Sequence, residues 1–209
     1  IGIGSGKTVF ARYMLPIIPF VCLLAAIAVS WLAARIRLLP VSPRASVLAV
    51  AGLTALAGSL SVARAFAFDR LVSRDDNRVA AARMLETMFP APTTAYQFGT
   101  DYARLQLPPR FQVWIPDPAL NPMDAPAAAL PEIVIVPSSR LPIYTPPPAA
   151  EIYEILRRRY KPLARFDAEV QQPANDLVYD PQDAFFVPLT GFASIRRPGP
   201  AIDVFRLEK

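Results

Sequence analysis

The residues at the start of the chain are of the types that nucleotide-binding loops use. Residues 2–8 are Gly-Ile-Gly-Ser-Gly-Lys-Thr, and glycine amides followed by a lysine can bind phosphate where they open a helix. A phosphate-binding loop also needs a glycine six residues before the lysine, where this chain has Ile1, and a strand that leads into the loop. We therefore interpret residues 2–8 as a glycine-rich loop and not as a nucleotide site.

Two pairs of carboxylates have a spacing that acid/base catalysis can use. Asp75 and Asp76 are adjacent, and Asp180 and Asp183 are three residues apart. Each pair lies beside a turn or helix-cap signal, which explains an aspartate without catalysis. The chain has no histidine and one cysteine, which excludes a His-based triad, a His/Cys zinc site and an intrachain disulfide. We expect no catalytic residue, metal site or cofactor in this chain.

A cluster of cations has the composition of a nucleic-acid or anionic-lipid patch: Arg157, Arg158, Arg159, Lys161 and Arg165. All 17 acidic residues of the chain lie from Asp69 onward, where they slightly outnumber the basic residues, and the aromatic neighbours of the cluster fall on the expected core face. We predict a solvent-exposed helix face and no nucleic-acid partner. Contact with lipid head groups or lipid-linked phosphate is the alternative.

The first third of the chain has the composition of a membrane segment. The sequence is 53% hydrophobic and only 19% charged. Residues 13–34 contain no charged side chain, and residues 45–66 contain only Arg64. Each stretch is long enough to cross a hydrocarbon core of about 30 Å as a helix. The sequence predicts a membrane segment over residues 1–68 with two transmembrane helices that belong to a larger bundle.

The connection between the two spans indicates their orientation. It carries Arg35, Arg37 and Arg44, and short loops rich in cations lie on the cytoplasmic side. Both flanks, and the domain over residues 69–209, are then predicted to be extracytoplasmic. A secretory signal peptide is an alternative for the first span, but its apolar core would be shorter and would lead into a cleavage site.

Both spans carry residues that are typical of larger bundles. Pro16 and Pro19 lie near the outer end of the first span, where they would bend or unwind its first turns. The second span has small residues suited to close helix packing at Gly52, Gly58, Ser59 and Ser61. A simple hairpin anchor is the alternative. Because the chain begins at Ile1 without a methionine, we expect it to be the C-terminal piece of a longer polypeptide.

From residue 69 onward the pattern predicts a small mixed α/β domain. Residues 73–76 resemble a capping box, and apolar residues then recur at helical spacing until Pro90. Three prolines at 146–148 open a second helix, which we extend through Tyr160. Strands are expected at residues 93–98, 111–115 and 132–136, around 178, at 185–187 and at 202–207.

Two parts of the chain resemble a family of membrane glycosyltransferases. Residues 11–19, Ala-Arg-Tyr-Met-Leu-Pro-Ile-Ile-Pro, resemble the late membrane region of polyprenyl-phosphate-sugar glycosyltransferases of the GT-C fold. Residues 179–192, Tyr-Asp-Pro-Gln-Asp-Ala-Phe-Phe-Val-Pro-Leu-Thr-Gly-Phe, and residues 196–200, Arg-Arg-Pro-Gly-Pro, are similar to the C-terminal signature of bacterial family 39 members. That group includes protein mannosyltransferases and aminoarabinose transferases. The three phenylalanines of this ending are expected to pack the outer domain onto itself or onto the membrane bundle.

The resemblance implies a multi-pass enzyme of the bacterial inner membrane. Such an enzyme transfers a sugar from a polyprenyl-phosphate carrier to a protein, lipid or glycan acceptor at the outer face, and its acidic general base lies upstream of Ile1. Lys7 and Arg12, with Tyr13 beside them, would bind the lipid phosphate by charge-assisted hydrogen bonds. Anchoring of the span at the head groups is the alternative role for these cations. The alternative function is a membrane-anchored extracytoplasmic binding module without catalytic activity.

Overall fold

The computed structural model describes residues 16–37, 42–115, 125–170, 176–182 and 184–208. The chain divides into two compact units, Ile1–Asp69 and Arg70–Lys209. Two long apolar helices build the first unit, and a mixed five-stranded sheet with helices builds the second. The general fold class, helices followed by an α/β domain, is therefore as the sequence predicts.

Two of the described helices are long and apolar enough to cross a membrane, by their length and composition. They are α1 (Ile18–Arg37) and α2 (Pro43–Val72). Because α1 begins at Ile18, Pro19 lies in the first turn, where its missing N–H has no helical partner to lose. This proline therefore starts the described helix and does not break it. Helix α2 continues to Val72, beyond the predicted end at residue 66.

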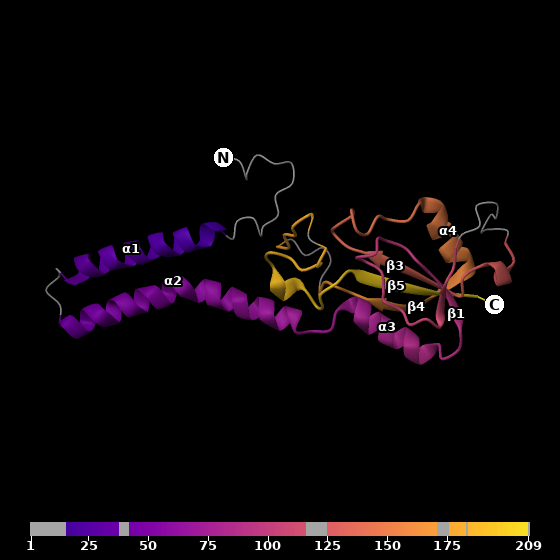
Figure 1. Cartoon of the computed structure of the whole chain (residues 1–209), viewed down its shortest axis with the longest axis horizontal. Helices are drawn as coiled ribbons and strands as arrows, with labels where there is room; N and C mark the ends of the chain where they lie inside the picture. Colours follow the sequence, from indigo (N-terminus) through magenta and orange to yellow (C-terminus); the bar gives the residue numbers. More distant parts are fainter. Residues whose placement is uncertain (1–15, 38–41, 116–124, 171–175, 183, 209) are drawn as a thin grey trace. The chain divides into compact units, whose positions relative to one another are not determined.

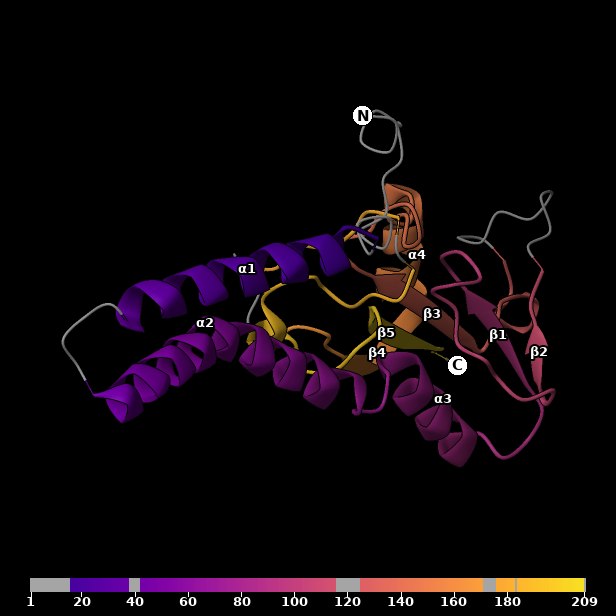
Figure 2. The same ribbon diagram turned by 60° about the vertical axis from the view of Figure 1, so that its left-hand side comes forward.

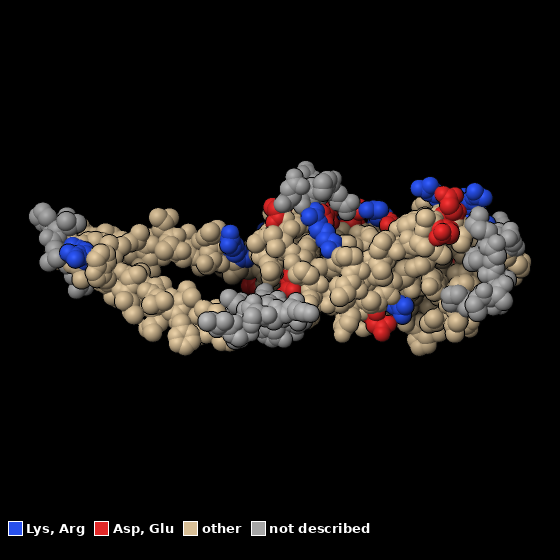
Figure 3. All heavy atoms as spheres, turned by 90° about the horizontal axis from the view of Figure 1, so that it is seen from above, with Lys and Arg blue, Asp and Glu red and all other residues tan. Residues whose placement is uncertain are grey.

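The side chains on these helices are largely exposed in the structure. None of the window Ile18–Ile36 is buried, and charged side chains are sparse over both helices (Figure 3). The hydroxyls of Thr54 and Ser59 donate to carbonyls of their own helix at 2.9 and 2.7 Å, so each finds a partner within α2. A Cβ placed at Gly52 or Gly58 would meet no described atom within 4 Å, so the predicted small-residue face is open.

The second unit is a sheet covered on both faces. The sheet order is β2-β1-β3-β5-β4, with β1 (Thr93–Gln97), β2 (Phe111–Val113), β3 (Ile133–Ser138), β4 (Tyr160–Phe166) and β5 (Ala201–Leu207). Strand β1 is parallel to β2 and β3, and β5 is antiparallel to β3 and β4. Helices α3 (Asn77–Met88) and α4 (Ala150–Arg159) lie on opposite sides of the sheet (Figure 1, Figure 2).

The alternating side chains of β3 build the two core layers. Ile133 and Ile135 are fully buried in the layer that contains Leu85 of α3. Val134 and Val136 lie in the other layer, which contains Leu156 and Tyr160. Successive strand residues point to opposite faces, so a strand covered on both sides is apolar throughout. This explains why the apolar run at 132–136 correctly predicted a buried strand.

Several predicted elements differ in the structure. Helix α4 ends at Arg159, and the residues after it form β4, a strand the sequence did not predict. The strand predicted around 178 is only an isolated bridge between Val178 and Thr190, and none of the described residues of 185–187 forms a strand. Pro181 and Pro188 flank this region, and a proline cannot donate a ladder hydrogen bond.

The capping box predicted at residues 73–76 is wrong in its position. Asp76 is the N-cap of α3, and its carboxylate accepts the Arg78 N–H at 2.7 Å. The Ser73 hydroxyl instead donates to the Arg70 carbonyl at 3.1 Å, at the end of α2. Because α2 extends to Val72, Ser73 terminates one helix and does not begin the next.

Candidate functional site

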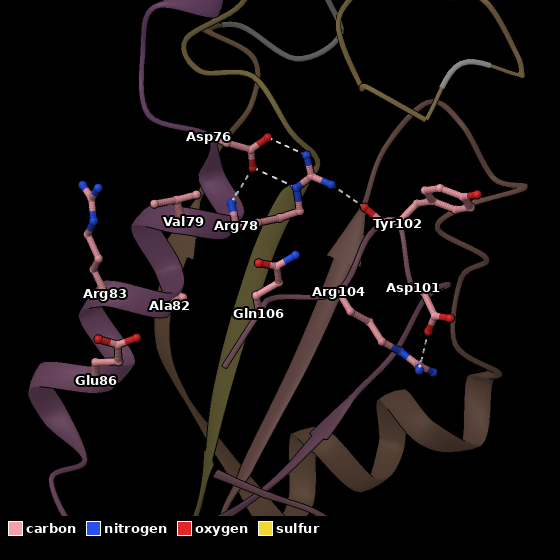
Figure 4. Close-up of a pocket in the computed structure, with 10 residues that line it drawn as sticks. All are labelled: Asp76, Arg78, Val79, Ala82, Arg83, Glu86, Asp101, Tyr102, Arg104 and Gln106. Carbon is pink, nitrogen blue, oxygen red and sulfur yellow. Dashed lines mark hydrogen bonds and ion pairs between the residues drawn. The ribbon is translucent and has the colours of Figure 1, made fainter. Parts of the chain in front are cut away.

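A cleft in the α/β unit lies between α3 and the loop that joins β1 to β2. It has a volume of about 640 Å³. Figure 4 shows charged side chains from both elements lining it, and the helix supplies Asp76, Arg78, Val79, Ala82, Arg83 and Glu86. The loop supplies Asp101, Tyr102, Arg104 and Gln106. The lining therefore balances three arginines against three carboxylates.

Arg78 is held at the upper end of the cleft by a fork-shaped ion pair (Figure 4). Its Nε donates to Asp76 Oδ1 at 2.9 Å, and its Nη2 lies 2.7 Å from Asp76 Oδ2. Its Nη1 donates to the Tyr102 carbonyl of the facing loop. Two parallel hydrogen bonds between a guanidinium and a carboxylate are strong, and they also fix the orientation of the guanidinium. Asp76 thus caps α3 and orients Arg78 with the same carboxylate.

The same guanidinium contacts the C-terminal part of the chain. It lies 5.4 Å from the ring centroid of Phe186, a buried residue with a φ of 55°. That backbone conformation is rare for a bulky side chain and needs firm support from its surroundings. The ring also packs edge-on against Tyr144, with the centroids 5.9 Å apart. Arg78 therefore joins α3, the β1–β2 loop and the C-terminal segment.

The remaining arginines of the cleft have exposed partners. Arg83 pairs with Asp75 at 2.6 Å, and Arg104 pairs with Asp101 at 3.1 Å. Within the described structure no ion pair is assigned to Glu86, whose carboxylate can accept a ligand's hydrogen bonds. A cleft with balanced charges and several planar polar groups suits a polar molecule without a large net charge, such as one rich in hydroxyls.

A second, smaller cavity lies at the carboxyl end of β3. It measures about 200 Å³, and its lining includes Arg140, Glu169 and Tyr179. Arg140 donates to both carboxylate oxygens of Glu169, at 2.8 and 2.9 Å, and this bond raises the pKa of Arg140. Burial, with a smaller contribution from the Glu169 charge, raises the pKa of Tyr179 to about 12. The tyrosine therefore stays a neutral hydrogen-bonding group. The ion pair joins the segment that follows β3 to the segment that follows β4.

The predicted phosphate-binding residues Lys7, Arg12 and Tyr13 lie outside the described residues. Asp183 does as well, whereas Asp180 is buried and accepts the Gln182 N–H at 3.1 Å. The other carboxylate pair is split between two structural roles, since Asp75 pairs with Arg83 while Asp76 caps α3. Among the described residues there is no group of three potential metal ligands.

The predicted basic cluster does not lie on one helix face. Lys161 and Arg165 belong to β4, and the three arginines end α4. Arg157 and Arg158 lie 3.6 and 3.7 Å from Glu154. Lys161 pairs with Glu208 at 2.7 Å, and Arg165 pairs with both Asp167 and Asp203. These pairs leave little net positive charge for an anionic polymer or a membrane.

Sequence reasoning did not identify the arginines of the cleft. Arg78 follows its N-cap by two residues, and this spacing is a local signal that can be recognised once the helix start is known. Arg104 reaches the cleft only because the loop after β1 folds back beside α3, and no local pattern encodes that. Comparisons with known protein families, with curated proteins and with solved structures find no match to this chain.

Proposed function

We propose that this chain is the C-terminal part of a membrane glycosyltransferase. The enzyme would move a sugar from a polyprenyl-phosphate carrier to an acceptor at the outer face of the bacterial inner membrane. The α/β unit would then be the extracytoplasmic domain. The proposal draws on the sequence resemblance at both ends of the chain and on two apolar helices of membrane-spanning length.

The observation that carries the proposal is where the resembling C-terminal segment packs. Arg74 donates to the Arg196 carbonyl at 2.8 Å, and the Asn77 N–H donates to the Pro198 carbonyl at 2.9 Å. Both partners lie in the turn region between α2 and the body of α3. Residues 196–200 therefore pack against the first residues of the α/β unit. In the proposed enzyme, this contact would help to hold the outer domain at the end of α2.

In the proposed reaction, the bond between the sugar C1 and the phosphate oxygen of the carrier breaks. A new bond forms between C1 and the acceptor atom, whose proton goes to the upstream acidic base, and polyprenyl phosphate leaves. Lys7 and Arg12 would neutralise the phosphate as its charge develops. In this scheme the chain contributes binding and support, and the upstream part contributes the base.

The test is sugar transfer by the complete gene product in proteoliposomes. The probes are polyprenyl phosphates carrying tritium-labelled mannose or aminoarabinose, with membranes of the source cell as acceptor. Arg12→Ala should raise the donor KM or lower kcat by about tenfold, since one charged hydrogen bond contributes about 1.5 kcal/mol. The control Arg157→Ala changes an exposed cation of α4 and should leave both parameters unchanged. The proposal would be contradicted if neither labelled donor is consumed. It would also be contradicted if Arg12→Ala, at normal protein levels, has the KM and kcat of the wild type.

The cleft beside α3 favours a second candidate, a membrane-anchored binding module. Its volume of about 640 Å³ is large enough for a sugar-sized polar ligand. The encoding DNA upstream of Ile1 separates the two candidates. Many further spans and an acidic residue in the first outer loop support the enzyme, whereas a start codon directly before Ile1 supports the anchored module.

A further inference from the structure

The segment over residues 177–182 and 184–195, here called the junction segment, is exposed and apolar at several positions. Val178, Phe185 and Leu189 are 53%, 71% and 47% exposed. Val178 and Leu189 lie together, because the Leu189 N–H donates to the Val178 carbonyl at 2.7 Å. Exposed large apolar residues on adjacent backbone segments, as at Val178 and Leu189, suit contact with another apolar phase.

The junction segment is fixed to the last turn of α2. Leu71 is 2% exposed and packs in one cluster with Leu177 and Ile195. Along a continuous helix the rise is about 1.5 Å per residue. Leu71 therefore comes about 4.5 Å along α2 after Phe68, the last apolar residue before Asp69 and Arg70, where the apolar stretch of this helix ends.

Charged side chains of both signs lie next to the junction segment, and the basic ones are arginines. Arg70, Arg74, Arg196 and Arg197 are all exposed and belong to the same unit. Two of the nearby acids pair with arginines outside this group, Asp75 with Arg83 and Asp76 with Arg78, whereas the Asp176 carboxylate accepts the Ser194 hydroxyl at 2.8 Å and keeps its charge. Arginine beside apolar and aromatic side chains is the composition of a membrane interface, where the cations meet anionic head groups.

We propose that the junction segment lies in the head-group region of the bilayer and binds its surface with Val178, Phe185 and Leu189. The inference rests on the proposed function, because it requires α2 to span the same membrane. An apolar surface of this kind enters the boundary between head groups and acyl chains by about 5–10 Å. Insertion of these side chains would restrict the tilt of the α/β unit relative to the membrane plane.

The experiment measures depth with single cysteines, because Cys22 is the chain's only cysteine. Leu189→Cys and Val178→Cys are made in a Cys22→Ser background, with Val113→Cys as the matched control. Val113 is 80% exposed and lies in β2 at the edge of the sheet. Each cysteine carries an NBD fluorophore, and the full chain is placed in vesicles of phosphatidylethanolamine and phosphatidylglycerol that contain lipids with shallow nitroxide quenchers.

We expect the shallow quencher to reduce emission from positions 178 and 189 by about twofold or more, with little change at position 113. Native Cys22, labelled in the unchanged chain and measured with lipids that carry the nitroxide deep in the acyl chain, reports insertion of α1 separately. If Cys22 is quenched while position 189 behaves like position 113, the interface proposal fails and membrane insertion stands. If Cys22 is not quenched either, both fail. Shielding of position 189 from aqueous iodide without lipid quenching would indicate a protein contact and would also overturn the proposal.

Discussion

Arg78 connects three parts of the α/β unit through one side chain. Its pair with Asp76 is only partly exposed, with 27% and 20% of the two side chains accessible. Arg78→Ala removes the counter-charge of a capping carboxylate and the donor to the Tyr102 carbonyl. We predict a loss of about 2 kcal/mol in the free energy of unfolding, because hydrogen bonds between charged groups are the strong ones.

Chemical denaturation of the full chain in detergent measures this loss, with Arg83→Ala as the control. The pair of Arg83 with Asp75 has 65% and 57% of its side chains exposed, and exposed pairs contribute about 0–1 kcal/mol. Equal midpoints for the two variants would show that the Arg78 fork does not stabilise the domain.

Two buried tyrosines should make the free energy of unfolding depend on pH in the alkaline range. Burial raises the pKa of Tyr160 and of Tyr179 to about 12, against about 10 in an unfolded chain. Between about pH 10 and 12 the unfolded state releases protons that the folded state keeps, so stability falls over that window and is fully present below it. Denaturation midpoints across the window should fall for the wild type and fall less for Tyr179→Phe. The exposed-site variant Tyr153→Phe serves as control, and a flat profile for the wild type would contradict the assignment.

At the scale of elements, the turn before β5 closes over the start of α3. Gly199 has a φ of +93°, and a Cβ there would lie 2.8 Å from the Asp76 carboxyl carbon. Gly199→Ala is therefore expected to lower stability by about 2 kcal/mol or more. Gly58→Ala is the control, because no described atom lies within 4 Å of a Cβ there and alanine favours a helix by about 1 kcal/mol. Thermal unfolding compares the two, and a neutral Gly199→Ala would show that the turn can move away.

The sequence predicted the elements whose own residues determine them. The α3 pattern ended at Pro90 as expected, and the buried strand at 132–136 was visible because both of its faces are apolar. Strand β4 was missed because Pro162 and its charged neighbours have weak strand propensity. Strand β4 forms the edge of the sheet, where a proline is tolerated. Its pairing with β5, with a register shift between Pro162 and Ala164, outweighs the weak strand propensity of its residues.

The candidate site was predictable only in part, for the same reason. The sequence placed a cap signal over residues 73–76, but which of these residues caps α3 depended on where α2 ends. The fork to Arg78 follows from that start, whereas the contacts to Tyr102 and Phe186 join residues that are distant in sequence. Long-range contacts of this kind are set by the packing of the whole domain, and no local spacing encodes them.

At the scale of the whole molecule, composition and fold divide the chain at nearly the same place. The two helices are long and apolar enough to span a membrane, and the charged residues concentrate in the unit Arg70–Lys209. In the proposed enzyme this division separates the part that lies in lipid from the part that faces the outer aqueous phase. The central claim is therefore that the connection near Ser42 and the α/β unit lie on opposite sides of a membrane.

Thiol labelling in intact cells tests that claim most directly. In a Cys22→Ser background, Ser42→Cys reports the connection between α1 and α2, and Glu151→Cys reports α4; both positions are exposed. A membrane-impermeant maleimide should label Glu151→Cys on intact spheroplasts and should label Ser42→Cys only after the membrane is permeabilised. Equal labelling of the two positions before permeabilisation, or recovery of the chain in the soluble fraction, would contradict the account.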